Sequence, residues 1–334
     1  MVKNIWRSVS LALACVFVAT SVHAEEKTSL QLRYKAPEIS EPLLNKRNVY
    51  RVKLGKTLFF DTRLSGSNWI SCATCHNPAM GWSDGLPTAI GEGQKALVRA
   101  TPTILNTAYN HLQMWDGRFR SLEEQAMGPI GAEGEMNQNP NELVEELKAI
   151  PGYVVMFNDA YPGRGITRDT ISMALASFER TIISTKAPFD RWVEGEANAI
   201  SPAAKRGFAL FEGKAHCSTC HSGYNFTDDG FHNIGLKSRD IGRFAVKPVA
   251  VTKGAFKTPT LRNIARTAPY MHNGAYQTLE EVIDHYVRGG DETANLSPNF
   301  KKIYLNKYEK SDLLAFLKTL TSDSVSFTYP DMPN

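Results

Sequence analysis

The sequence predicts a mainly α-helical protein made of two similar domains, and three observations support this prediction. A glycine followed by a leucine–phenylalanine pair occurs twice, at residues 55–59 and 207–211, and each copy precedes a Cys-x-x-Cys-His motif. Several segments carry apolar residues at helical spacing, whereas period-two runs long enough for a sheet are absent from the sequence. The 334 residues also match the length of about two ordinary domains.

The predicted helices are placed by their spacing and their start signals. Residues 55–59 and 207–211 lie in the first helix of each domain, and the second of these helices begins at Ser201 with Pro202 in its first turn. Near the end, a helix starting at Ser311 carries an i, i+3, i+4, i+7 apolar stripe, which indicates a buried face. Residues 141–149, 168–183 and 188–193 also have helical spacing, and the stripe consists of Leu313, Phe316, Leu317 and Leu320.

The two Cys-x-x-Cys-His motifs have the attachment pattern of c-type haem. Two thiols one helical turn apart add to the haem vinyl groups, and the following histidine supplies an imidazole ligand to the iron. Two disulfides or a zinc site built from both cysteine pairs are the alternatives, but neither needs a histidine directly after each pair. We therefore predict two covalent haems, attached at Cys72, Cys75 and His76 and at Cys217, Cys220 and His221.

The organisation of the chain agrees with two haem domains. A short segment at residues 195–202 separates the halves, so we expect an N-terminal haem domain at residues 25–195 and a C-terminal haem domain at residues 196–334. Each half contains a long irregular stretch, residues 80–103 in the first and residues 223–257 in the second. Loops of this length are long enough to enclose a haem.

The first 24 residues have the features of a secretory signal peptide. Lys3 and Arg7 form a basic start, residues 11–20 are apolar, and small or apolar residues precede the predicted cleavage site before Glu25. The apolar run is shorter than the ~20 residues of a membrane span, which disfavours an uncleaved anchor. A lipoprotein cut before Cys15 is disfavoured further, because few apolar residues precede the cut. We expect a periplasmic protein without a membrane span.

The charge of the chain excludes one class of partner. The formal net charge is +4, and it is +2 without the first 24 residues, which carry two basic residues and no acid. Nucleic-acid binding requires a strongly basic domain, so we expect no nucleic-acid partner. With 42% apolar and 22% charged residues, the composition is otherwise that of an ordinary globular protein.

Further short motifs follow one another in a fixed order around the two haem sites. They include Asp84-Gly-Leu-Pro-Thr-Ala-Ile-Gly91, Trp115-Asp-Gly-Arg118, Leu122-Glu-Glu-Gln-Ala126, Gly128-Pro-Ile130, Ala187-Pro-Phe-Asp190 and Leu261-Arg-Asn-Ile264. With these motifs, the chain from about Leu54 to Thr321 resembles the bacterial di-haem cytochrome c peroxidases and their MauG-like relatives. The resemblance implies two cytochrome c-like domains. It also implies that the N-terminal haem reacts with hydrogen peroxide while the C-terminal haem passes electrons.

The resemblance also identifies residues of the peroxide site. Glu135 matches the distal glutamate of the family, and Gln125 joins it there. A carboxyl group that is partly desolvated beside a haem has a raised pKa, which suits proton transfer. Family peroxidases cap the resting N-terminal iron with a histidine from the loop after Gly91, where this chain has Glu92. We expect an open iron position, with Glu92 either a solvated loop carboxylate or a second acid–base candidate.

The resemblance also assigns roles to a tryptophan and a tyrosine, namely electron transfer between the haems and ligation of the second haem. Trp115 matches the family's tryptophan between the haems, where an indole can carry a transient electron hole; core packing is the alternative. Counted from the Leu261 motif, Tyr286 stands where peroxidases have methionine and MauG-like proteins have tyrosine. Tyrosinate stabilises oxidised iron, whereas methionine raises the potential. We expect Tyr286 to be the distal ligand of the second haem. His285 is the rival, and Met271 and His272 lie in a turn that reads as structural.

The family commonly holds a calcium ion between its domains. An asparagine side chain supplies one ligand, and the carbonyls that match Thr267 and Pro269 supply others. This chain has Ala100 at the asparagine position. Calcium takes several oxygen ligands, so the loss of one need not abolish binding, and we leave one calcium ion as an open expectation.

Three functions compete at this stage. The first is MauG-like oxidation of a residue on a periplasmic partner protein, driven by hydrogen peroxide. The second is reduction of hydrogen peroxide to water with electrons from a small cytochrome c or copper protein, and the third is non-enzymatic electron transfer. A carrier needs both irons capped, so Glu135, Gln125 and the missing distal histidine argue against the third. Tyr286 favours the first, and we predict a di-haem peroxidase-type oxidoreductase of that kind.

Overall fold

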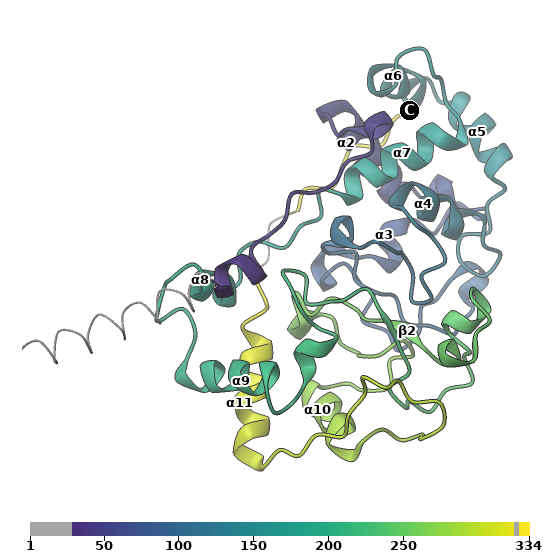
Figure 1. Ribbon diagram of the computed structural model, residues 1–334. Helices are drawn as coiled ribbons and strands as arrows, with labels where there is room; N and C mark the ends of the chain where they lie inside the picture. Colours follow the sequence, from purple (N-terminus) through teal and green to yellow (C-terminus); the bar gives the residue numbers. More distant parts are fainter. Residues whose placement is uncertain (1–28, 324–326) are drawn as a thin grey trace, which may run out of the picture.

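The computed structural model describes residues 29–323 and 327–334, so the predicted signal peptide lies outside the described residues. Within these ranges the protein is rich in helix, and its one ladder is antiparallel, joining β1 (Phe231–His232) to β2 (Phe256–Lys257). The helices gather in two groups, seen at the top and bottom of Figure 1. The prediction of a mainly α-helical fold is confirmed. No helix of the described part is long and apolar enough to cross a membrane.

The helices of each group follow the chain. In the first half they are α2 (Val49–Phe60), α3 (Cys72–Cys75), α4 (Leu122–Gly131), α5 (Pro140–Lys148), α6 (Pro151–Ala160) and α7 (Arg168–Glu179). In the second half they are α8 (Pro188–Val193), α9 (Pro202–Glu212), α10 (Leu279–Arg288) and α11 (Lys307–Lys318). Short 3₁₀ turns lie between them at Leu43–Asn45, Thr62–Leu64, Pro78–Met80, Glu92–Gln94, Thr107–Tyr109, Cys217–Thr219, Arg243–Ala245, Ala250–Thr252 and Ile264–Arg266.

Two of the predicted helix limits need correction. The spacing predicts a helix over residues 168–183, but α7 ends at Glu179. The last helix begins earlier than the predicted start at Ser311, because the Asn306 side chain caps it by accepting hydrogen bonds from the amides of Tyr308 and Glu309. The predicted N-cap Ser201 is confirmed, since its side chain accepts from the amide of Ala204.

The first domain is organised around the crossing of α2 and α7. Gly55 lies at the crossing, where a Cβ atom would come closer than 3.0 Å to the carbonyl oxygen of Ala174 and 2.9 Å from the Cβ of Phe178. The missing side chain lets the two helix backbones approach each other. Close packing of α2 against α7 therefore requires the glycine of the sequence repeat.

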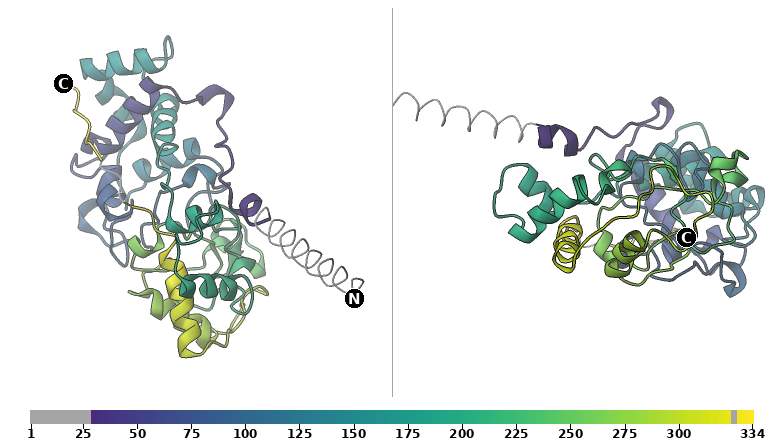
Figure 2. Two further views of the ribbon diagram at one scale, coloured as in Figure 1. Left: turned by 90° about the vertical axis from the view of Figure 1, so that its left-hand side faces the viewer. Right: turned by 60° about the horizontal axis from the view of Figure 1, so that its bottom comes forward.

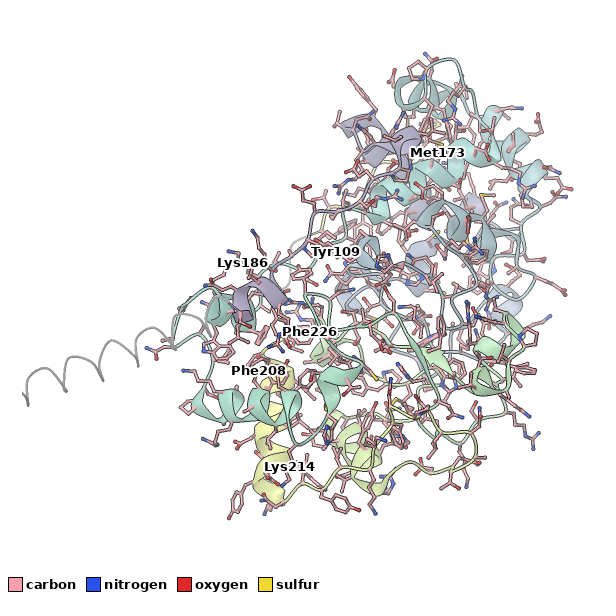
Figure 3. All side chains as sticks on the ribbon, in the orientation of Figure 1. Tyr109, Met173, Lys186, Phe208, Lys214 and Phe226 are labelled. Atoms are coloured by element: carbon pink, nitrogen blue, oxygen red, sulfur yellow. The ribbon has the colours of Figure 1, made fainter. Side chains whose placement is uncertain are left out.

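The second domain repeats this crossing with α9 and α11, which lie side by side at the bottom of Figure 1. A Cβ atom on Gly207 would come closer than 3.0 Å to the carbonyl oxygen of Asp312 and 2.9 Å from the Cβ of Phe316. Position by position, Asp312 thus corresponds to Ala174 and Phe316 corresponds to Phe178. Aromatic packing completes this core, where Phe208 and Phe226 each lie 5.4 Å from Phe189 between ring centroids (Figure 3).

We expect Gly207→Ala to lower the free energy of unfolding by ~1–3 kcal/mol, because an added methyl group must push apart two helix backbones. Denaturant unfolding of the haem-loaded protein measures this effect. Gly131→Ala is the matched control, because a Cβ atom there meets only Pro140, at 3.6 Å. Equal stability of the two variants would show that the α9–α11 crossing relaxes freely.

The first and the last of the described residues pack on the domain far from them in sequence. Near the start, Tyr34 stacks on Phe226 in the core of the second domain, with ring centroids 5.1 Å apart. The C-terminal tail returns to the first domain (Figure 2, left). There Phe327 stacks on Phe60, with ring centroids 5.0 Å apart. Phe189 of α8 also packs in the second core, although the predicted boundary at residue 195 assigns it to the first domain. Side-chain packing therefore crosses that predicted boundary.

Candidate active site

The first Cys-x-x-Cys-His motif opens onto a cavity in the N-terminal domain. The cavity has a volume of about 580 Å³ and is lined by Cys72, Cys75 and His76, which belong to α3 and its C-cap. The Nδ1 atom of His76 donates a hydrogen bond to the carbonyl oxygen of Trp82 at 3.2 Å. This bond orients the ring and makes Nε2 the nitrogen that can bind a metal.

The second motif opens in the same way onto a cavity in the C-terminal domain. This cavity has a volume of about 510 Å³ and is lined by Cys217, Cys220 and His221. The Nδ1 atom of His221 donates to the carbonyl oxygen of Phe226 at 2.9 Å. The two sites therefore share one local design.

These residues fit a covalently attached haem. The four cysteines of the two motifs are unbridged, and each cavity has the size of a cofactor pocket. The two cysteine pairs line different cavities, so they do not form the zinc site considered from the sequence. Among the described residues, one group of three metal-ligating side chains lies close together, namely Cys220, Asp228 and His232. It includes a cysteine of the second motif and therefore belongs to that site.

Glu135 and Gln125 both line the N-terminal cavity. Glu135 follows the end of α4, and burial raises the pKa of its carboxyl group, an effect that Arg118 partly offsets. The side-chain amide of Gln125 lies 3.8 Å from the sulfur of Met114. Glu92 is not among the lining residues, because its carboxylate accepts a hydrogen bond from Ser67 at 2.8 Å.

Trp115 lies in the wall that separates the two cavities. It lines both of them, and its indole N–H donates to the carbonyl oxygen of Ala100 at 2.9 Å. Its own carbonyl oxygen accepts from the amide of Lys257 at 2.8 Å. The other residues that line both cavities are Lys257, Pro259, Ile264, Tyr270 and Met271. Trp115 therefore lies between the two cavities, where the resemblance predicts a tryptophan.

An ion-pair network fixes the chain next to this tryptophan. Arg99 contacts Asp116 at 2.7 Å and Asp240 of the second domain at 2.6 Å, and Arg118 contacts Asp116 at 2.9 Å. Burial opposes ionisation of Asp116, but hydrogen bonds from Arg118 and Arg99 outweigh it and hold the pKa of this carboxyl below its usual value. Arg243 also donates to the carbonyl oxygen of Asp116 at 2.7 Å. These contacts join the two domains beside Trp115.

The neighbours His285 and Tyr286 on α10 face different surroundings. His285 is fully buried and does not line the cavity. Its Nδ1 is hydrogen-bonded to the Tyr276 hydroxyl at 2.9 Å, and its Nε2 donates to the Ile234 carbonyl at 2.8 Å. Tyr286 lines the second cavity, and burial raises the pKa of its phenol. Only one of the two rival side chains is therefore presented to the site.

Three residues line the cavities although their role was not foreseen from the sequence. Met271 lines both cavities and His272 lines the second, where its ring stacks on Phe256 with centroids 3.6 Å apart. Glu179, the last residue of α7, lines the first cavity and is almost fully buried. Glu179 directly follows Phe178, which packs at the helix crossing, and this position is the sequence feature that could have indicated a cavity-lining residue.

Comparisons with known proteins agree with this geometry. Residues 50–198 match the family model of the di-haem cytochrome c peroxidases, and residues 204–321 match that of cytochrome c. The chain is 48% identical to the methylamine utilization protein MauG of Methylorubrum extorquens, over 92% of this chain and 89% of that protein. It is 36% identical to the cytochrome c551 peroxidase of Nitrosomonas europaea, over 97% and 93%.

A solved structure supports the same conclusion. The crystal structure of a MauG-like protein associated with microbial copper homeostasis matches with a TM-score of 0.80 and 32% identity, over 87% of this chain and 96% of that one. The chain therefore belongs to the di-haem cytochrome c peroxidase family, whose members are peroxidase-type oxidoreductases with c-type haem. Within this family it is a MauG-like enzyme. The predicted family, cytochrome c-like fold and enzyme class are thus confirmed.

Proposed function

We propose that this enzyme uses hydrogen peroxide to oxidise a residue on a partner protein. The observation that supports this most strongly is the second cavity, which presents Tyr286, while the two hydrogen bonds of His285 hold that imidazole outside it. A tyrosinate ligand stabilises oxidised iron, so this site accepts electrons poorly from a small donor protein and retains an oxidising equivalent well. Reaction with a partner residue is then favoured over rapid peroxide scavenging.

The residues that would hold the two haems are those of the two motifs together with the tyrosine. When bound, the haems supply the redox chemistry that cleaves the peroxide O–O bond and retains the oxidising equivalents. Thioether bonds and one histidine would fix each group. The proposed attachment and iron-binding residues are Cys72, Cys75 and His76 in the first cavity, and Cys217, Cys220, His221 and Tyr286 in the second.

Glu135 is the proposed acid–base group. Its carboxylate takes the proton from one oxygen of hydrogen peroxide and gives it to the other oxygen, which leaves as water when the O–O bond breaks. The raised pKa suits a group that must both accept and donate this proton. Gln125 lines the same cavity and positions the peroxide through its side-chain amide.

Trp115 is the proposed relay between the two sites. Its indole lies in their shared wall, with the ring held by the hydrogen bond to Ala100 and the adjoining backbone held by Asp116 and its arginines. An electron taken from the partner residue passes the second site and crosses this wall to the first. Partner oxidation therefore does not require the partner to enter the peroxide cavity.

The cellular setting follows from the sequence. The signal-peptide pattern of the first 24 residues supports export to the periplasm, where the partner would be met. The calcium ion that the family commonly holds would rest here on backbone carbonyls, because Ala100 has no side-chain oxygen and its carbonyl already accepts from Trp115. Metal analysis of the purified protein tests for that ion.

Steady-state turnover of hydrogen peroxide with a reduced small cytochrome c separates the proposal from its main alternative. The similarity to the cytochrome c551 peroxidase of Nitrosomonas europaea makes peroxide scavenging the second candidate. We expect slow turnover, together with a peroxide-induced absorption change that persists while the reduced cytochrome is present. Fast, saturable oxidation of the cytochrome would instead identify a cytochrome c peroxidase.

A further inference from the structure

Glu179 is a buried carboxyl group that the proposed reaction does not use. It is the last residue of α7, is only 6% exposed, and lines the N-terminal cavity. The next residue, Arg180, is committed elsewhere, since its guanidinium binds both oxygens of Glu123 at 2.7 Å. Within the described residues, no group hydrogen-bonds to the Glu179 carboxylate. The carboxylate oxygens open on the cavity and are not enclosed by protein atoms, while burial of the side chain makes its charged form unfavourable.

The internal repeat shows what this position does in the second domain. Because Phe178 at the α2–α7 crossing corresponds to Phe316 at the α9–α11 crossing, Glu179 corresponds to Leu317. Leu317 lines the C-terminal cavity as Glu179 lines the N-terminal one. The two sites thus share their attachment motif and helix crossing, but only the first has a carboxyl group at this point of its wall. Packing alone is satisfied by leucine, so the glutamate has another role.

The surroundings of Glu179 favour its protonated, neutral form but still allow the carboxyl group to ionise. Burial raises the pKa of this carboxyl to about 8, with Arg180 lowering it and Glu123 raising it again. From α3, Cys72 is close enough for the charge of Glu179 to raise the pKa of its thiol. On α2, Lys56 is engaged elsewhere, over the ring of Phe327. The other titratable or charged side chains of the cavity are Cys75, His76, Arg99, Arg118, Glu135, Lys257 and Tyr270.

We propose that Glu179 couples proton transfer to electron transfer at the N-terminal site. When one electron enters this site, Glu179 takes up one proton from solvent, and when the electron leaves, Glu179 releases that proton. Added negative charge favours the protonated carboxyl group, and removed negative charge favours the carboxylate. The carboxylate then stabilises the oxidised site, which the peroxide reaction requires. This inference rests on the proposed attachment of a haem at Cys72, Cys75 and His76.

Redox titration of each haem in the holoenzyme between pH 6 and pH 10 tests this coupling. In the wild type, the potential of the N-terminal haem should fall as the pH rises through a window near the pKa of Glu179, which is about 8. In Glu179→Gln, which keeps the shape but cannot ionise, this fall should be lost. Glu179→Leu, which copies the second domain, should give the same flat profile. The C-terminal haem is the internal control, and its pH profile should be equal in all three proteins.

Three results would overturn the inference or its basis, and they are distinguishable. An unchanged pH profile in Glu179→Gln would assign the proton to another group, and Glu135→Gln would then be titrated in the same way. Equal loss of pH dependence at both haems would show a global effect of the substitution. A wild-type protein with only one haem, measured as the pyridine haemochrome, would instead refute the attachment of two haems. Infrared difference spectra give a second readout, since reduction should produce a carboxylic-acid band in the wild type that Glu179→Gln lacks.

Discussion

In Glu135→Gln, the absorption change that follows addition of hydrogen peroxide should be slower by ~10²–10⁴-fold, the contribution of a positioned acid–base group. Glutamine keeps the volume and hydrogen-bonding reach of the side chain but cannot transfer the proton between the two peroxide oxygens. Both haems should remain attached, because the two Cys-x-x-Cys-His motifs hold them. Stopped-flow absorption measures the rate directly.

The matched control for this variant is Glu92→Gln. Glu92 lies in the neighbouring loop, and its amide donates to the Glu135 carbonyl, but its carboxylate contacts Ser67 and does not line the cavity. The control should therefore react at the wild-type rate. If Glu135→Gln reacted at the wild-type rate and Glu92→Gln did not, the roles of the two carboxylates would be reversed.

The pH dependence of the same reaction provides a second check on Glu135. Its carboxylate is the form that accepts the proton, and burial raises its pKa. The wild-type rate should therefore decrease as the pH falls through that raised pKa. Glu135→Gln should show no such decrease, because its side chain does not titrate.

Tyr286→Met should raise the potential of the second haem by on the order of 0.1 V or more, within the ~0.8 V range that axial ligands cover. Methionine stabilises reduced iron relative to tyrosinate, so turnover of peroxide with a reduced small cytochrome c should increase as well. Redox titration and steady-state kinetics measure the two effects.

Tyr276→Phe is the control for the choice of ligand. The hydroxyl of Tyr276 is hydrogen-bonded to Nδ1 of His285, so its removal perturbs that imidazole and leaves Tyr286 in place. We expect this control to leave the potential of the second haem at the wild-type value. A shifted potential in Tyr276→Phe, with an unchanged one in Tyr286→Met, would make His285 the ligand.

The features predicted correctly from the sequence are those encoded by residues close together in the chain. Two thiols and a histidine within five residues define each attachment motif without reference to the fold. Gly55 and Gly207 mark the helix crossings because each lies three residues before a leucine–phenylalanine pair. The N-cap at Ser201 is equally local. Local chemistry therefore predicts the two-site organisation.

The features that residues close together in the chain do not determine depend on contacts between distant segments. His285 and Tyr286 are adjacent on α10, and the partners that occupy His285 come from Tyr276 and from Ile234 in a separate loop. Glu179 is one of 34 acidic residues, and only the packing of α7 places it at the cavity wall. The exchange of chain ends between the domains also has no local sequence signal.

We propose that the two sites act as one oxidising unit joined through Trp115. Electron paramagnetic resonance of the fully oxidised protein, frozen at intervals after mixing with one equivalent of hydrogen peroxide, tests this most directly. We expect the ferric signals of both haems to decrease together, with the same time course, although only the first site reacts with peroxide. Loss of the first signal while the signal of the second haem stays unchanged would contradict the claim.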